Sequence, residues 1–170
     1  KVILTFDDAM SCHYDYVYKV LSKRNLWGIF YVPTQPYQKD KVLDVHRIHL
    51  LCGAYGGIEL LSTLKAFLQK EMVPDEKREE FRKQTYTRQD NYEGISEFKR
   101  ILNYFVSYDF REQLIDKVAR ELNYAFNTSE FYVPVEKLNA MQLSGNLIGS
   151  HTVSHPVMSK LTKTEQNEEI

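Results

Sequence analysis

The chain has 170 residues, which is enough for one ordinary domain with a hydrophobic core. Hydrophobic residues make up 43% of the chain and charged residues 26%, a balance that excludes disordered and fibrous proteins. The formal net charge of −1 gives no broad attraction to nucleic acid, and no apolar run is long enough to span a membrane, so we expect neither as a partner.

The first part of the chain has the pattern of two strands around a helix. Val2–Phe6 is a short apolar and β-branched run that predicts a strand buried on both faces, ending at Asp7 and Asp8. In Ser11–Arg24 the apolar residues recur at intervals of three and four, which indicates a helix, and Gly28–Val32 is a second strand. This order predicts a parallel sheet or barrel with ligand chemistry at the carboxyl ends of its strands.

The middle of the chain, residues 37–130, has a different pattern. It has few β-branched pairs, many Lys, Glu, Arg, Leu and Gln residues, and apolar residues at helical spacing. Pro74 followed by Asp75 and Glu76 is typical of the start of a helix. We therefore expect a mainly α-helical insertion, which would act as a cap that restricts the substrate.

From residue 131 onward the α/β pattern returns. Val135–Leu143 is predicted as a helix, and Leu147–Gly149 as a third short strand. The expected fold class is α/β, in the form of a partial (β/α) barrel. Residues 1–36 would be its first part and residues 131–170 its continuation.

Polar side chains follow two of the predicted strands. Asp7 and Asp8 are adjacent, so only the turn after the strand could bring both to one site. His151 and His155 follow the third strand, and Pro156 favours a loop at His155 over a helix. Two imidazoles and one carboxylate would hold a divalent ion with positions open for water and substrate. Such an ion suits hydrolysis of an amide.

The runs Thr5–Asp8 (TFDD) and His151–Pro156 (HTVSHP) resemble the first two motifs of the polysaccharide deacetylases. This family has the NodB homology domain and is carbohydrate esterase family 4. The resemblance covers about residues 1–34 and 134–170, and it implies a barrel of the NodB-homology, distorted TIM-like type. It also implies a role in carbohydrate metabolism, as a hydrolase that cleaves carbon–nitrogen bonds other than peptide bonds and removes an N-acetyl group from an amino sugar or polysaccharide.

The resemblance also implies roles for individual residues. Asp7 would be the general base, while Asp8, His151 and His155 would bind the metal. A metal-bound water, deprotonated by Asp7, would then attack the acetyl carbonyl. Zinc is the expected ion, with cobalt, nickel and manganese as alternatives, and a carbohydrate substrate is the expected partner.

Other residues near these motifs have lesser expected roles or depart from the family pattern. Thr5 and Thr152 would shape the loops, and Ser154 would orient a ligand histidine from outside the ligand set. Ala9 stands where the family usually has Gly, so the loop would be slightly rebuilt. The later family motifs are not found, and we expect a truncated chain whose remaining catalytic groups lie beyond Ile170.

Alternative functions remain open on the sequence. One is a metal-independent amide or cyclic-imide hydrolase of the same fold, and another is a catalytically silent module that binds a glycan or a protein. A two-histidine, one-carboxylate iron oxygenase is disfavoured by the helical composition. The oligomeric state is open. Two cysteines and no recognisable signal peptide weakly favour a soluble, cytoplasmic protein.

A second group of potential ligands lies in the middle of the chain. His46, His49 and Cys52 are three residues apart, but three-residue steps drift around a helix, so core or surface positions are favoured over a second metal site. Cys12 and His13 are expected to line the start of the first helix.

Overall fold

The computed structural model describes residues 2–74, 78–128 and 131–170. Its Cα positions divide into two compact units. The first, which we call the sheet unit, comprises Lys1–Leu43 and Asn127–Ile170, and the second, the helical unit, comprises Asp44–Phe126. We describe each unit by itself.

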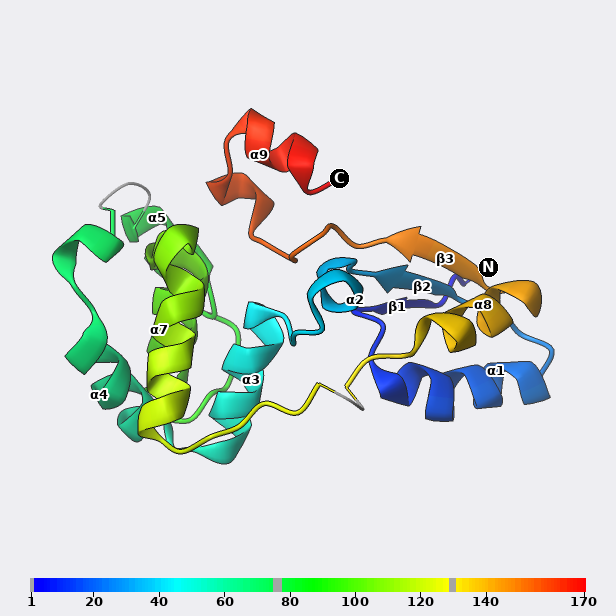
Figure 1. Cartoon of the computed structure of the whole chain (residues 1–170), viewed down its shortest axis with the longest axis horizontal. Helices are drawn as coiled ribbons and strands as arrows, with labels where there is room; N and C mark the ends of the chain where they lie inside the picture. The colour runs from blue at the N-terminus through cyan, green and yellow to red at the C-terminus, as the bar shows by residue number, and fades with distance from the viewer. Residues whose placement is uncertain (1, 75–77, 129–130) are drawn as a thin grey trace. The chain divides into compact units, whose positions relative to one another are not determined.

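A three-stranded parallel sheet forms the centre of the sheet unit (Figure 1). The strands β1 (Thr5–Asp7), β2 (Ile29–Val32) and β3 (Leu147–Ser150) lie in the order β1-β2-β3. In the register, Phe30 of β2 lies between Phe6 of β1 and Ile148 of β3. The predicted parallel sheet is therefore confirmed, and the carboxyl ends of all three strands lie at the same edge.

The first strand differs from its prediction. It begins at Thr5, whereas Val2, Ile3 and Leu4 precede it and are 86%, 66% and 37% exposed. The prediction of a strand over Val2–Phe6 that is buried on both faces is therefore wrong. Among the described residues, β1 pairs with β2 alone, so the segment before it has no second neighbour to exclude water.

Helices of the sheet unit cover the core of the sheet. The predicted first helix is confirmed, although its first part is a π-helix, η1 (His13–Tyr18), followed by α1 (Lys19–Lys23). The helix α8 (Val135–Leu143) has the bounds that the sequence predicts. The buried apolar side chains of this core come from the segment after β1, from α1, β2 and α8, and from the segment before α8: Ala9, Leu21, Phe30, Val32, Val133, Leu138 and Met141.

Short helices follow β2 and β3. The helix α2 (Gln35–Lys39) comes directly after β2, and η4 (Met158–Lys160) and α9 (Lys163–Glu168) follow β3. The helix α9 begins with a capping box in which Thr162 and Glu165 bond to each other's backbone N–H groups.

The helical unit contains α-helices and shorter helical turns around its own core. Its elements are α3 (Asp44–Ala54), α4 (Gly57–Phe67), η2 (Lys70–Met72), α5 (Arg78–Gln84), α6 (Ile95–Arg100), η3 (Ile101–Phe105) and α7 (Tyr108–Glu121). The described part of this segment is helical, as predicted, whereas its interpretation as an insertion or cap stays a prediction. Of the expected helix start at Pro74, Asp75 and Glu76, the last two lie outside the described residues.

Buried charges join α3 to α7 within the helical unit. Arg47 is 2% exposed and bonds to Asp44 at 3.1 Å and to Asp116. Arg111 of α7 donates to the other oxygen of Asp44 at 3.1 Å. The guanidinium of Arg47 also lies over the Phe126 ring, 4.6 Å from its centroid. Asp44 therefore stabilises two buried guanidinium groups at once.

In the part of the chain that the structure describes, no helix combines the length and apolar character needed to cross a membrane.

Candidate metal centre

Asp8 lies in a tight turn directly after β1. Its φ is 78° and that of Ala9 is 50°, both in the left-handed region that favours glycine. Such a φ costs about 1–2 kcal/mol for a residue with a Cβ atom. The turn is held by neighbouring backbone, because Val133 donates to the Ala9 carbonyl at 2.8 Å and Met10 forms an antiparallel bridge with Tyr132. Ala9 therefore lies in a strained but buried turn, and the rebuilding of this loop relative to the family stays a prediction.

The loop after β3 is held against the segment after β2. The N–H of His151 donates to the Val32 carbonyl at 3.0 Å, which extends the pairing of the two strands. At the first residue of α2, the N–H of Gln35 donates to the Val153 carbonyl at 2.9 Å. The start of α2 thus fixes the middle of the histidine loop.

The histidine loop itself is tightly curved. Thr152 has a φ of 63° and His155 a φ of 56°, and the N–H of His155 donates to the Thr152 hydroxyl at 3.0 Å. Thr152 thus contacts the loop that it is expected to shape, and that role stays a prediction. The curvature brings the rings of His151 and His155 to a centroid distance of 4.7 Å, as the preference for a loop over a helix predicts.

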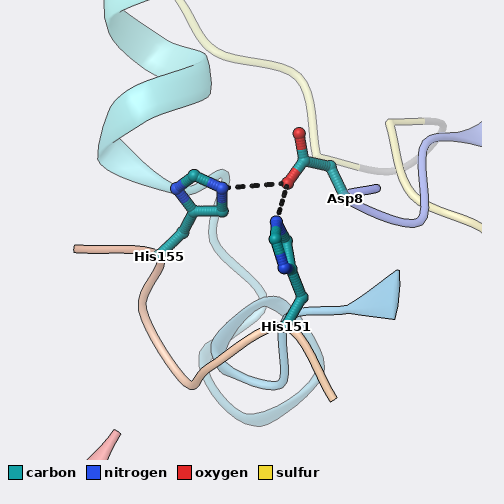
Figure 2. Close-up of side chains that lie close together, drawn as sticks. All are labelled: Asp8, His151 and His155. Carbon is teal, nitrogen blue, oxygen red and sulfur yellow. Dashed lines mark ion pairs between the residues drawn. The ribbon is translucent and has the colours of Figure 1, made fainter. Parts of the chain in front are cut away.

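Asp8, His151 and His155 converge on one point (Figure 2). Oδ1 of Asp8 lies 3.5 Å from Nε2 of His151 and 3.3 Å from Nε2 of His155. One ligand atom from each residue lies within 4.8 Å of the others, and all three side chains are half-buried. Sequence reasoning therefore selected three side chains that the structure brings together.

The distances at this point match those expected around a bound cation. Ligands about 2.1 Å from a tetrahedral zinc ion lie about 3.4 Å from one another. The two distances from Asp8 to the imidazoles are close to that value, and both exceed the roughly 2.7–2.9 Å of a short charge-assisted hydrogen bond. The donor set and its spacing therefore fit a divalent ion.

The other predicted site residues lie outside this cluster. Asp7 is exposed at the end of β1, and Thr5 is exposed at its start. The Ser154 hydroxyl donates to the Glu169 carboxylate and not to an imidazole, so its contact differs from the one expected. The roles of these three residues stay predictions.

The side chain of His13 lies near Asp8. The ring of His13 lies 5.8 Å from that of Phe6 and 6.1 Å from that of Phe30. Burial lowers the pKa of His13, against the opposing effect of the Asp8 and Asp7 charges. Cys12 and His13 do line the start of the first helix, as predicted. The effect of both carboxylates on the pKa of His13 could not be predicted from the sequence.

Tyr132 was missed by sequence reasoning. Its hydroxyl accepts a hydrogen bond from the Leu43 N–H at 3.0 Å. Burial raises the pKa of Tyr132, and the Asp8 charge raises it further. Its position next to Asp8 depends on the bridge to Met10, a contact between distant parts of the sequence that no local pattern reveals.

Tyr31 packs beside the histidine loop. Its ring lies 6.2 Å from that of His151, and a Cβ atom at Gly149 would lie 2.7 Å from it. The absence of a side chain at Gly149 therefore gives Tyr31 room to lie against β3.

The weaker sequence hypothesis of a second metal site is not supported. Among the residues that the structure describes, His46, His49 and Cys52 do not bring three ligand atoms together. His46 is buried in α3, whereas burial raises the pKa of the Cys52 thiol to about 11.

Comparison with protein families gives one clear result. A family model described as polysaccharide deacetylase matches residues 1–170, the whole chain. The match thus extends beyond residues 1–34 and 134–170, where the motifs lie. Neither curated proteins nor solved structures give a significant match.

Proposed function

Because the chain belongs to the polysaccharide deacetylase family, we propose that it is a metal-dependent hydrolase that removes an N-acetyl group from an amino sugar or a polysaccharide. Family membership indicates a deacetylase or hydrolase activity toward amide bonds. The observation that supports metal dependence is the convergence of Asp8, His151 and His155.

The ligand set is that of a catalytic centre. Three protein ligands leave at least one position for water or substrate, whereas structural zinc sites are closed by four protein ligands. We propose zinc, with cobalt, nickel or manganese as alternatives. A divalent ion held there supplies a more acidic water molecule and polarises the carbonyl of the substrate.

The two neighbouring aspartates have different roles in this proposal. Asp8 holds the ion together with His151 and His155, and Asp7 is the general base. A carboxylate near a cation stays ionised at neutral pH, which is the state that accepts a proton from the attacking water. Asp7 is exposed at the end of β1, where a substrate can approach it.

The finer fold assignment belongs to the same proposal. We propose that the sheet unit is part of a NodB-type (β/α) barrel, formed by residues 1–36 and 131–170. Residues 37–130 would then be the insertion, acting as a cap that restricts the carbohydrate substrate. The parallel order β1-β2-β3 and the separate core of the helical unit support this division.

Substitution of the four residues tests the proposal. Asp8→Ala, His151→Ala and His155→Ala should each abolish tight zinc binding, measured by competition with a chromophoric chelator. Asp7→Asn should keep the metal and lower acetate release from N-acetylglucosamine oligomers by about 100- to 10,000-fold, because it removes only the base.

Two controls sharpen this experiment. His49→Ala removes an exposed histidine of α3, and Asp15→Asn removes an exposed carboxylate of η1, so neither should change zinc affinity. Zinc retained after both ligand histidines are replaced would contradict the proposal. Full turnover after chelation would instead favour a metal-independent hydrolase, and glycan binding without acetate release would favour a binding module.

A further inference from the structure

The histidine loop is held by a residue that follows it by more than a dozen positions. Glu169 lies just after α9, and its carboxylate Oε2 accepts the N–H of Val153 at 2.9 Å and that of Ser154 at 2.7 Å. Its other oxygen, Oε1, accepts the Ser154 hydroxyl. The backbone carbonyl of Glu169 also accepts the Val153 N–H at 3.1 Å.

These contacts fall in the middle of the loop, between the two metal-ligand candidates. Val153 and Ser154 are two of the three residues that lie between His151 and His155. The residues on either side of this pair, Thr152 and His155, both have a positive φ. A loop with two such residues needs contacts from outside to keep its curvature, and Glu169 supplies them.

Glu169 is itself fixed by its own helix. Its N–H donates to the Glu165 carbonyl at 3.2 Å, and Glu165 belongs to the capping box with Thr162. The side-chain amide of Gln166 donates to the carbonyls of Met158 at 2.9 Å and of Leu161 at 3.2 Å. The carboxylate therefore reaches the loop from a helix with a defined orientation.

We propose that Glu169 is a positioning residue that holds the loop from His151 to His155 in the geometry that binds the metal. This inference rests on the proposed function. A carboxylate is suited to the role because it accepts two N–H groups and a hydroxyl at once, and charge-assisted hydrogen bonds are about twice as strong as neutral ones. Residues outside the ligand set that orient ligands are worth about 10- to 100-fold in metal affinity.

Zinc affinity of matched variants tests the metal part of the inference. Glu169→Ala should weaken zinc binding by about 10- to 100-fold, and Glu169→Gln should weaken it less, because the amide keeps the length and one acceptor oxygen. Glu168→Ala is the control, since it removes an exposed carboxylate of α9 beside Glu169 without removing a contact to the loop, and it should change zinc affinity by less than about 2-fold. An unchanged affinity of the Glu169→Ala chain would overturn the inference, as would an equal loss in the Glu168→Ala chain.

Amide hydrogen exchange of the metal-free chain tests the contacts between Glu169 and the loop independently of the metal. The amide of Ser154 should exchange at least about 10-fold faster in Glu169→Ala than in the wild type, because it loses its acceptor, whereas the amide of Val153 keeps the backbone carbonyl of residue 169 and should change less. In Glu168→Ala the amide of Ser154 should stay protected. Equal exchange in the wild type and in Glu169→Ala would overturn the inference. A wild-type chain that binds no zinc would overturn the proposed function. The exchange measurement would then still show whether Glu169 holds the loop.

Discussion

Single residues with unusual backbone angles surround the metal centre. Asp8, Ala9, Thr152 and His155 all have a positive φ, although none is a glycine. Strained residues of this kind persist only where surrounding contacts hold them, and they gather at functional sites. The Ala9 side chain is 1% exposed, so its methyl group is buried in the sheet-unit core at the position where the family usually has Gly. The strain is therefore offset by packing at the same residue.

His13 should give the chain a characteristic pH dependence. Burial lowers its pKa in the folded state from an ordinary value of 6.5, so the folded chain favours the neutral ring. Protonation therefore favours the unfolded state, and the stability that His13 contributes is present above 6.5 and is lost as the pH falls toward its folded pKa. We expect the free energy of unfolding of the metal-free wild type to fall between pH 7 and pH 5.

The variant His13→Phe isolates this effect. Its ring suits the space beside Phe6 and Phe30 and does not titrate. In urea unfolding curves measured across the same pH range, the variant should lose less stability than the wild type. Parallel pH dependence in the two chains would show that His13 is not buried in its neutral form.

At the residue scale, the sequence predicts the three candidate ligands but not the residues that contact and support them. Asp8, His151 and His155 could be predicted because each follows a strand end, and parallel strands place these ends at one edge. Glu169 and Tyr132 could not, since their contacts join segments far apart in the sequence. For Glu169, the local sequence shows only that an acidic residue stands one helical turn after Glu165.

At the scale of elements, the bounds of a helix could be predicted where residues typical of helix ends stand at both of its ends. The helix α8 was predicted with its observed bounds because Pro134 precedes it and Gly145, with a φ of 97°, follows it. The strand β1 was misjudged because burial depends on neighbours that periodicity does not reveal. The π-helical part of the first helix likewise has no signature in the spacing of its apolar residues.

Charge pairs between helices should differ in their contribution to stability. Asp44 is 17% exposed and bonds to two guanidinium groups that are 2% and 6% exposed, whereas Asp116 is 42% exposed. Asp44→Ala would leave both arginines without this partner and should lower the free energy of unfolding by about 3 kcal/mol. Asp116→Ala removes a solvent-screened pair and should cost less than about 1 kcal/mol.

Urea unfolding of the two variants provides the measurement. Both substitutions remove one aspartate from the same network, so they change the net charge equally. An Asp116→Ala chain that is destabilised as much as the Asp44→Ala chain would contradict the view that burial of the arginines makes Asp44 the central residue.

At the scale of the whole molecule, the family match and the site geometry support the same account. The family model covers all 170 residues, including the helical unit, which carries no recognisable motif. The three ligand candidates come from the sheet unit alone, from the turn after β1 and the loop after β3. We therefore propose that the sheet unit provides the chemistry and that the helical unit restricts the substrate.

The most direct test of the central claim is X-ray absorption spectroscopy of the zinc-loaded chain. We predict one zinc ion per chain, with two imidazole nitrogens and one carboxylate oxygen at about 2.0–2.2 Å and no sulfur ligand. The imidazole contribution should be lost in the His151→Ala, His155→Ala double variant. A spectrum without imidazole, a sulfur ligand, or an unchanged spectrum in the double variant would contradict the claim that Asp8, His151 and His155 bind one cation.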